Sequence, residues 1–178
     1  MKTKAEIMDA QGIARTLQRL THEILEQNRG SRNLVLVGIR NRGDSLARRI
    51  IGIVRSIEGE EPPLGVLDIT LYRDDFQKLS ESPVIRETDL PFDITDKNVI
   101  LVDDVLYTGR TIRAALDAIM DFGRPASIQL AVLVDRGHRE LPIKADYVGK
   151  YVPTAADEDV QVHLNEVDGR DAVLLIER

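Results

Sequence analysis

The amino-acid sequence predicts an α/β fold with a central parallel sheet that is flanked by helices. Three apolar runs, 33–39, 99–102 and 127–134, have the length and composition of buried parallel strands. The first two lead through a polar loop into a segment with apolar residues at helical spacing. Strands that alternate with helices are typical of a parallel sheet, which binds ligands at the carboxyl ends of its strands.

The polar loops that follow these runs are expected to meet at one edge of the sheet. They span residues 40–45, 103–111 and 135–142. Because parallel strands end on the same side of a sheet, we interpret the three loops as parts of a single active site.

Length and composition indicate one globular domain over residues 1–178. The hydrophobic fraction of 43% and the charged fraction of 30% are typical of a soluble protein. The absence of cysteine excludes disulfides and thiolate metal sites, and no apolar run is long enough to span a membrane. We therefore expect a cytoplasmic protein with no membrane partner.

The net charge of −6 argues against a protein that is coated in nucleic acid. The acidic residues are concentrated near the end of the chain, because residues 155–178 hold seven of them against two arginines. That segment accounts for −5, so the rest of the chain is close to neutral and could still form local basic patches.

A first helix is predicted over residues 10–27, and Asn28-Arg29-Gly30 is a typical helix end. Its apolar face consists of Ile13, Leu17, Leu20, Ile24 and Leu25. Its other face carries Arg15, Arg19 and His22, for which a solvated surface is the simplest interpretation.

The second unit combines the strand at 33–39, the basic loop 40–45 and a helix with inward apolar residues between 46 and 54. Arg40, Arg42 and Gly43 at the end of a strand suit an anion such as pyrophosphate. A basic surface turn is the alternative.

A third strand is predicted over residues 64–72, and it is followed by an unusually long polar connection over 73–96. Connections of this length inside a compact domain are usually functional lids or partly disordered. This one could itself form a short hairpin with strands near 70–73 and 84–87.

The segment 99–111 is the most informative part of the chain. Its apolar run is interpreted as a strand that ends at two adjacent carboxylates, Asp103 and Asp104, before a small turn. Gly109 and the hydroxyls of Thr108 and Thr111 make this turn, at the start of a helix, a suitable anion site. Carboxylates would repel a phosphate but suit sugar hydroxyls or a divalent cation, so the spacing fits a ribose 5-phosphate. An ordinary strand–helix turn is the alternative.

The remaining elements follow the same patterns. The helix from Ile112 ends near 122–125, and the strand at 127–134 follows. Residues 160–164 and 172–176 are predicted to form a terminal hairpin with Asp168-Gly169 at its turn.

All thirteen positions of 99–111 resemble the 5-phosphoribosyl-1-pyrophosphate (PRPP) motif of type I phosphoribosyltransferases. The strings 68–75 and 133–143 resemble one subfamily, the bifunctional attenuators of pyrimidine operons that are also uracil phosphoribosyltransferases. The resemblance implies the type I fold, with a parallel sheet, a flexible catalytic loop near 73–96 and a small hood near 134–178. It also implies Mg²⁺-dependent conversion of uracil and PRPP to UMP and pyrophosphate.

The resemblance also implies roles for individual residues. Asp103 and Asp104 would bind the ribose diol, directly or through hydrated Mg²⁺, and one of them could act as a base near uracil N1. Arg73 would be the third catalytic residue and, with Arg40, Asn41 and Arg86, would bind pyrophosphate. The loop that would bind the 5-phosphate consists of Val105, Leu106, Tyr107, Thr108, Gly109, Arg110, Thr111 and Ile112. The residues expected to line the uracil pocket are Arg136, Gly137 and His138.

The regulatory role that the resemblance implies is binding to a stem-loop of pyr mRNA leader, promoted by UMP or UTP. Phosphate contact requires clustered cations, and the candidates are Arg19, His22, Arg42, Arg139, Lys144 and Lys150. The resemblance further implies a homodimer or homotetramer. Three alternatives stay open: a uracil salvage enzyme without RNA binding, an RNA-binding regulator with vestigial catalysis, and a phosphoribosyltransferase for hypoxanthine and guanine.

Overall fold

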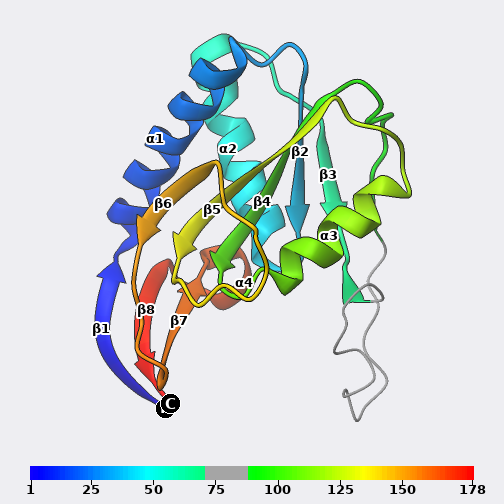
Figure 1. Cartoon of the computed structure of the whole chain (residues 1–178). Helices are drawn as coiled ribbons and strands as arrows, with labels where there is room; N and C mark the ends of the chain where they lie inside the picture. The colour runs from blue at the N-terminus through cyan, green and yellow to red at the C-terminus, as the bar shows by residue number, and fades with distance from the viewer. Residues whose placement is uncertain (71–87) are drawn as a thin grey trace.

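The computed structural model describes residues 1–70 and 88–178, and two sheets organise this part of the chain (Figure 1). The larger sheet has five parallel strands in the order β3-β2-β4-β5-β6. Their bounds are β2 Leu34–Ile39, β3 Leu64–Leu67, β4 Asn98–Leu106, β5 Ser127–Asp135 and β6 Tyr147–Tyr151. The smaller sheet is antiparallel in the order β1-β8-β7, with bounds β1 Lys2–Met8, β7 Glu158–His163 and β8 Ala172–Glu177.

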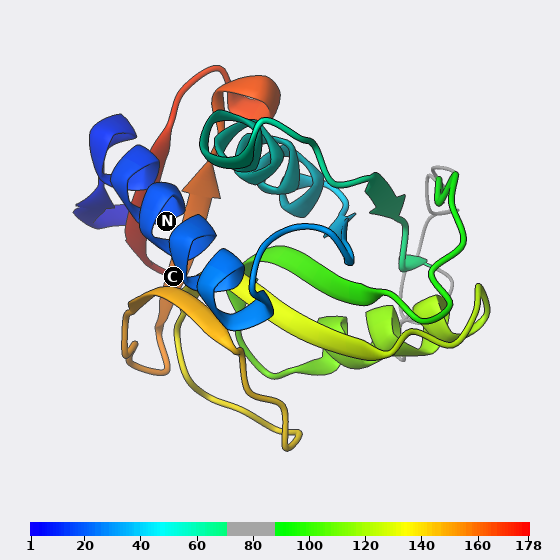
Figure 2. The ribbon, with the colours of Figure 1, turned by 90° about the horizontal axis from the view of Figure 1, so that it is seen from above.

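Helices cover both faces of the parallel sheet, as the sequence predicts (Figures 1 and 2). Alternate residues of β4 explain this arrangement, because Ile100 and Val102 pack with α1 Ala10–Asn28 and α2 Arg42–Glu58. Val99 and Leu101 face the opposite way and pack with α3 Arg110–Met120. A strand that is buried on both faces must be apolar at every position, which is the continuous run seen in the sequence.

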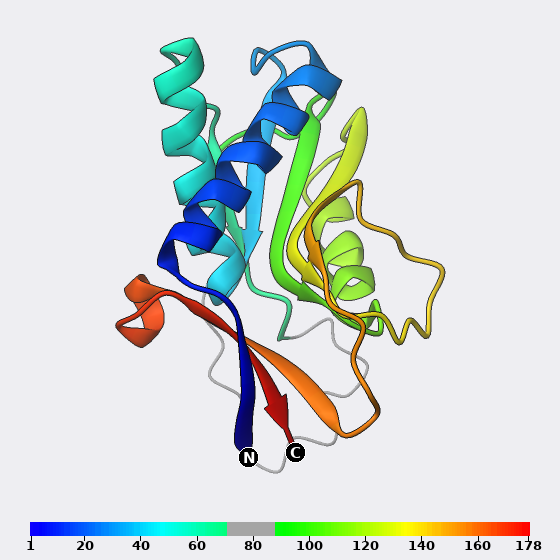
Figure 3. The same cartoon turned by 90° about the vertical axis from the view of Figure 1, so that its left-hand side faces the viewer.

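The antiparallel sheet lies beyond the carboxyl ends of the parallel strands (Figure 3). We call this sheet, together with the connection between β7 and β8, the hood. The predicted terminal pairing of 160–164 with 172–176 is confirmed by the β7·β8 register from Glu158–Glu177 to His163–Ala172. The connection is not a tight turn at Asp168-Gly169, however. It contains a helical turn, α4 Asn165–Asp168, that ends at Gly169 with a φ of 75°.

The N-terminal strand β1 was not expected from the sequence. Its residues are mostly exposed, so they lack the alternation of a half-buried strand, and β1 forms by pairing along β8. Hydrogen bonds from the far end of the chain therefore decide the conformation of this segment.

Two predicted strand boundaries were wrong. The third strand ends at Leu67 rather than Tyr72, although Val66 also exchanges two backbone hydrogen bonds with Asp89. Residues 71–73 and 84–87 of the predicted hairpin lie outside the described residues. The strand β4 does not end at the acid pair but continues to Leu106, because β5 pairs with it as far as Leu106–Asp135. Both carboxylates therefore stand on a rigid strand instead of in a loop.

Candidate active site

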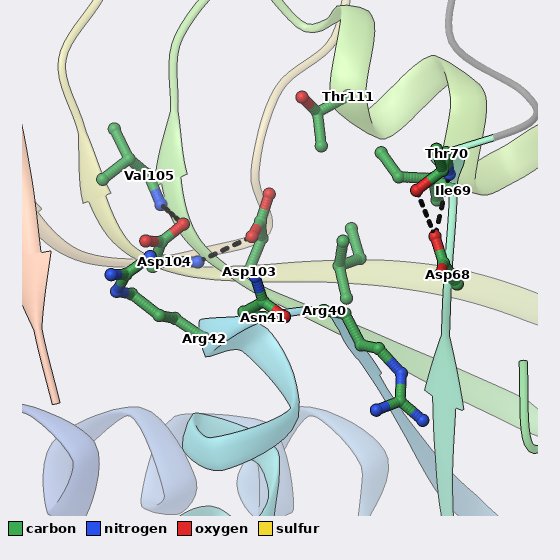
Figure 4. Close-up of a pocket in the computed structure, with 11 residues that line it drawn as sticks. Arg40, Asn41, Arg42, Asp68, Ile69, Thr70, Asp103, Asp104, Val105 and Thr111 are labelled. Atoms are coloured by element: carbon green, nitrogen blue, oxygen red, sulfur yellow. Dashed lines mark hydrogen bonds between the residues drawn. The ribbon is translucent and has the colours of Figure 1, made fainter. Parts of the chain in front are cut away.

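A cavity of about 520 Å³ opens at the carboxyl ends of β2, β3 and β4 (Figure 4). It combines the basic loop, the segment after β3, the acid pair and the start of α3. Its lining residues are Ile39, Arg40, Asn41, Arg42, Asp68, Ile69, Thr70, Asp103, Asp104, Val105 and Thr111. Two of the three loops that were expected to converge therefore meet in one cavity.

Two glycines bring the basic loop against β4. A Cβ atom on Gly43 would lie 2.3 Å from the Val102 carbonyl oxygen, and one on Gly38 would lie 2.3 Å from the Asp44 Cα. Contacts this short to backbone atoms are forbidden to any side chain, so only glycine allows α2 to start at this depth. The consequence is that Arg42 lies beside Asp104, whereas Arg40 lines the same cavity with its guanidinium directed away from the acid pair (Figure 4).

The acid pair is held by its own backbone. The Asp104 N–H donates to Asp103 Oδ1 at 2.9 Å, and the Val105 N–H donates to Asp104 Oδ1 at 2.8 Å. In the described part of the chain, neither carboxylate accepts a further protein hydrogen bond at its other oxygen. One oxygen of each acid is therefore committed to orientation, and the other can accept hydrogen bonds from a ligand.

The two carboxylates differ in their burial. Asp103 is only 6% exposed, and its burial, followed by the nearby charge of Asp104, raises the pKa of Asp103 well above its ordinary value. Asp104 is less buried and has Arg42 beside it (Figure 4). The pair thus favours a bound cation or hydroxyl donors, either of which relieves the repulsion between the acids.

The predicted 5-phosphate loop lies at the start of α3. Gly109 precedes that helix with a φ of 94°, which favours glycine, and Thr108 Oγ1 accepts the Arg110 N–H at 3.2 Å. The side chains of Leu106 and Ile112 are in the core, so these two positions can offer a ligand only their backbone.

The third polar loop, 135–142, supports the phosphate loop from behind. The Arg136 N–H donates to the Leu106 carbonyl at 3.0 Å, and the Glu140 N–H donates to the Thr108 carbonyl at 2.9 Å. Arg139 Nη1 donates to the Tyr107 carbonyl at 2.7 Å, while its other nitrogens bind Ile143 and Asp135. These bonds occupy the carbonyls of Leu106, Tyr107 and Thr108, which agrees with the prediction that an anion would bind to the amides of this loop.

The residues expected at the uracil pocket join the phosphate loop to the hood. Arg136 is 2% exposed and donates to Asp159, the Glu158 carbonyl and Thr154. Its guanidinium lies 4.0 Å from the centre of the Tyr107 ring, and His138 meets the same ring edge-on at 5.9 Å. His138 Nε2 lies 2.7 Å from the Thr154 carbonyl oxygen, which requires a proton on Nε2.

The six candidate RNA-binding residues are not all equivalent. His22, Lys144 and Lys150 are exposed, and Arg19 is half-exposed although it donates to the Val148 and Gly149 carbonyls of β6. Arg42 and Arg139 instead bind carboxylates within the fold, Arg42 at the cavity and Arg139 behind the phosphate loop.

Some predicted residues lie elsewhere, and some lining residues were not predicted. Arg73 and Arg86 lie outside the described residues. Asp68 and Thr70 line the cavity, with Asp68 Oδ1 accepting the N–H and hydroxyl of Thr70 at 2.9 and 2.6 Å. They follow β3 directly, so the same strand-end rule that identified Asp103 could have found them.

Asp103 and Asp104 fit a Mg²⁺ ion that arrives with a phosphorylated ligand. Within residues 1–70 and 88–178, no three His, Cys, Asp or Glu side chains are grouped to hold a metal ion. Mg²⁺ is, however, commonly held by one or two carboxylates and completes its shell with waters and substrate phosphates. Two carboxylate oxygens at the edge of a polar cavity are such a donor set.

Comparison with known proteins identifies the family. Residues 4–166 match the model of the phosphoribosyl transferase domain. The chain belongs to the phosphoribosyltransferase family. It is 61% identical over 176 residues to the "Bifunctional protein PyrR" of Pelotomaculum thermopropionicum, a match that covers 99% of this chain and 97% of that protein. It is 60% identical to the protein of the same name from Thermus thermophilus, over 100% of this chain and 98% of the relative.

Solved structures confirm the fold of the family. A hypoxanthine phosphoribosyltransferase from Trypanosoma cruzi superposes with a TM-score of 0.76 at 19% identity, over 98% of this chain and 96% of that one. At this identity the likeness concerns the fold alone, which is the type I phosphoribosyltransferase fold. No helix in the described part of the chain is long and apolar enough to cross a membrane.

Proposed function

We propose that the protein transfers the ribose 5-phosphate group of PRPP to N1 of uracil, which yields UMP and pyrophosphate. The observation that carries the proposal is the meeting of the acid pair, Thr111 at the start of α3 and the basic loop in one cavity of about 520 Å³. A bound phosphoribosyl group presents hydroxyls, a 5-phosphate and a pyrophosphate, and each of these has a matching surface there.

In this proposal each part of the donor has its own binding group. The amides from Leu106 to Thr111 and the hydroxyls of Thr108 and Thr111 hold the 5-phosphate. Asp103 and Asp104 accept hydrogen bonds from the ribose diol. Arg40 and the Asn41 backbone hold the pyrophosphate, and the peptide bond that joins these two residues is cis.

The reaction asks the protein for positioning and charge. The bond from the anomeric carbon to pyrophosphate breaks while the bond to uracil N1 forms, and one of the two acids, Asp103 or Asp104, takes the N1 proton. Positive charge develops on the ribose in between, so preorganised carboxylates that bind its hydroxyls lower the barrier. A Mg²⁺ ion, when bound with PRPP, would neutralise charge on the leaving pyrophosphate.

Acceptance of uracil rather than a purine is supported by the strings 68–75 and 133–143 and by relatives at about 60% identity that are named bifunctional. The test is an assay with PRPP, Mg²⁺ and either uracil, hypoxanthine or orotate. We expect turnover of uracil alone. Turnover of hypoxanthine in its place would overturn the assignment of the acceptor.

We also propose that the protein binds a pyrimidine-operon mRNA leader, with uridine nucleotides promoting the complex. The name "Bifunctional protein PyrR" of both relatives supports a second activity, and Arg19, His22, Lys144 and Lys150 supply cations for phosphate contacts. A gel-shift titration with the leader RNA, with and without UMP, tests it. We expect affinity that rises with UMP and falls steeply with salt, and no shift at low salt would refute RNA binding.

A further inference from the structure

Arg42 lies between two carboxylates from distant parts of the chain, Asp104 and Asp168. Its Nε and Nη2 donate to the two oxygens of Asp168, at 3.1 and 2.8 Å. Figure 4 shows the same guanidinium beside the Asp104 carboxylate, and both Arg42 and Asp104 line the cavity. Asp168 belongs to α4 in the hood, so the hood reaches the acid pair through one side chain.

A second arginine joins α2 to α4 and to the segment that follows it, but it does not line the cavity. Arg49, two turns further along α2, donates to both oxygens of Asp171 at 2.9 and 2.7 Å, and it also binds Glu166. Asp171 and Asp168 have one further feature in common, because each accepts a backbone N–H at the start of α4. Asp168 accepts that of Leu164 at 2.9 Å, and Asp171 accepts that of Asn165 at 2.7 Å.

We propose that Asp168 is a positioning residue for the ribose site, and that it acts on Asp104 through Arg42. A two-pronged hydrogen bond fixes a guanidinium in one plane. Held in this way, Arg42 stabilises the negative charge of Asp104 without taking the carboxylate oxygen that the ribose hydroxyls need. This inference rests on the proposed binding of PRPP.

The charges of the three groups agree with this arrangement. The hydrogen bond to Asp168 raises the pKa of Arg42, and the charge of Asp104 raises it further, although burial acts in the opposite direction. The hydrogen bond from Arg42 likewise lowers the pKa of Asp168. Arg42 therefore remains a cation beside Asp104 over the whole range in which the enzyme would work. His163, whose Nδ1 lies 3.9 Å from Asp168 Oδ1, also faces this pair.

Without its anchor, Arg42 is expected to swing onto Asp104 and form a direct ion pair that competes with the ribose. The substitution Asp168→Asn removes the charge that holds Arg42 while an amide oxygen can still accept the Leu164 N–H. We expect the KM for PRPP to rise about tenfold and the KM for uracil to change less than twofold. Calorimetric titration with PRPP and Mg²⁺ in the absence of uracil should show an equal loss of affinity for PRPP.

Asp171→Asn is the matched control, because it removes an equivalent bond between α2 and the hood away from the cavity. We expect it to lower thermal stability as much as Asp168→Asn does, with the KM for PRPP unchanged. If the wild type is active and the two variants have the same KM for PRPP, the positioning role of Asp168 is overturned and the proposed function is not. An inactive wild type would instead overturn the proposed function.

Two further variants keep the test independent of folding. Asp168→Glu keeps the charge and should recover most of the affinity for PRPP. Arg42→Gln should raise the KM for PRPP because Asp104 loses its stabilising cation. In that background Asp168→Asn should have no further effect, since it acts only through Arg42. Additive effects of the two substitutions would also overturn the proposal.

Discussion

Gly43 and Gly52 allow one substitution to be tested in two environments of the same helix. Both residues belong to α2, but a Cβ atom on Gly43 would lie 2.3 Å from the Val102 carbonyl oxygen, whereas one on Gly52 would meet nothing within 4 Å. Gly43→Ala and Gly52→Ala are therefore expected to change stability in opposite directions.

The magnitudes follow from these two environments. At Gly43 the obstacle is the backbone of β4, which cannot rotate away, so α2 must shift, and overpacking of this kind costs about 1–3 kcal/mol. At Gly52 the methyl group is free, and the gain in helix propensity is about 0.5–1 kcal/mol. With roughly 2–4 °C per kcal/mol for a chain of this size, Tm should fall by about 2–12 °C in the first variant and rise by about 1–4 °C in the second.

The assay combines thermal unfolding with steady-state kinetics. Val102 immediately precedes Asp103, so the shift in Gly43→Ala should displace the basic loop from the acid pair and lower kcat/KM for PRPP about tenfold or more. Gly52→Ala should leave kcat and the KM for PRPP within twofold of the wild-type values. A Gly43→Ala protein with unchanged Tm and activity would refute the claim that close backbone approach builds the site.

Three further predictions concern single side chains. Asp104→Asn should lower kcat by about 100-fold or more with little loss of Tm, since an amide oxygen can still accept the Val105 N–H that Asp104 Oδ1 accepts; retained turnover would contradict the ribose assignment. Because the folded-state pKa of Asp103 is raised, the metal-free protein should lose stability as pH rises from about 4, the unfolded value, through the folded pKa. Asp103→Asn should remove that decline in melts from pH 4.5 to 8, and an identical slope in the variant would show that another group causes it. Arg136→Met should cost about 2–3 kcal/mol in urea unfolding, because it leaves buried partners of a charged donor unpaired; a cost below about 0.5 kcal/mol would mean that the hood is held by other contacts.

Local sequence determined most of the fold and the centre of the site. The apolar runs at 33–39, 99–102 and 127–134 predict the three central strands, because burial on both faces demands an apolar residue at every position. The Asp103-Asp104 pair and the turn at Gly109 could also be found in the sequence. The acid pair and the turn are recognisable because all their residues lie within ten positions of one another in the sequence. The turn also requires a glycine, because Gly109 has a φ of 94°.

The tertiary structure alone decided what the arginines do. The guanidiniums of Arg42, Arg136 and Arg139 were interpreted as surface or pocket groups, yet each has a carboxylate partner within the fold. For Arg42 that partner is 126 residues away in the sequence, and a pattern of neighbouring residues cannot predict a contact over such a separation. The exposed strand β1 is a similar case, since its pairing along β8 joins the two ends of the chain. Apolar periodicity indicates which face of an element is buried, whereas the packing of the elements decides which groups become hydrogen-bond partners. The sequence could therefore predict the site but not the contacts that stabilise it.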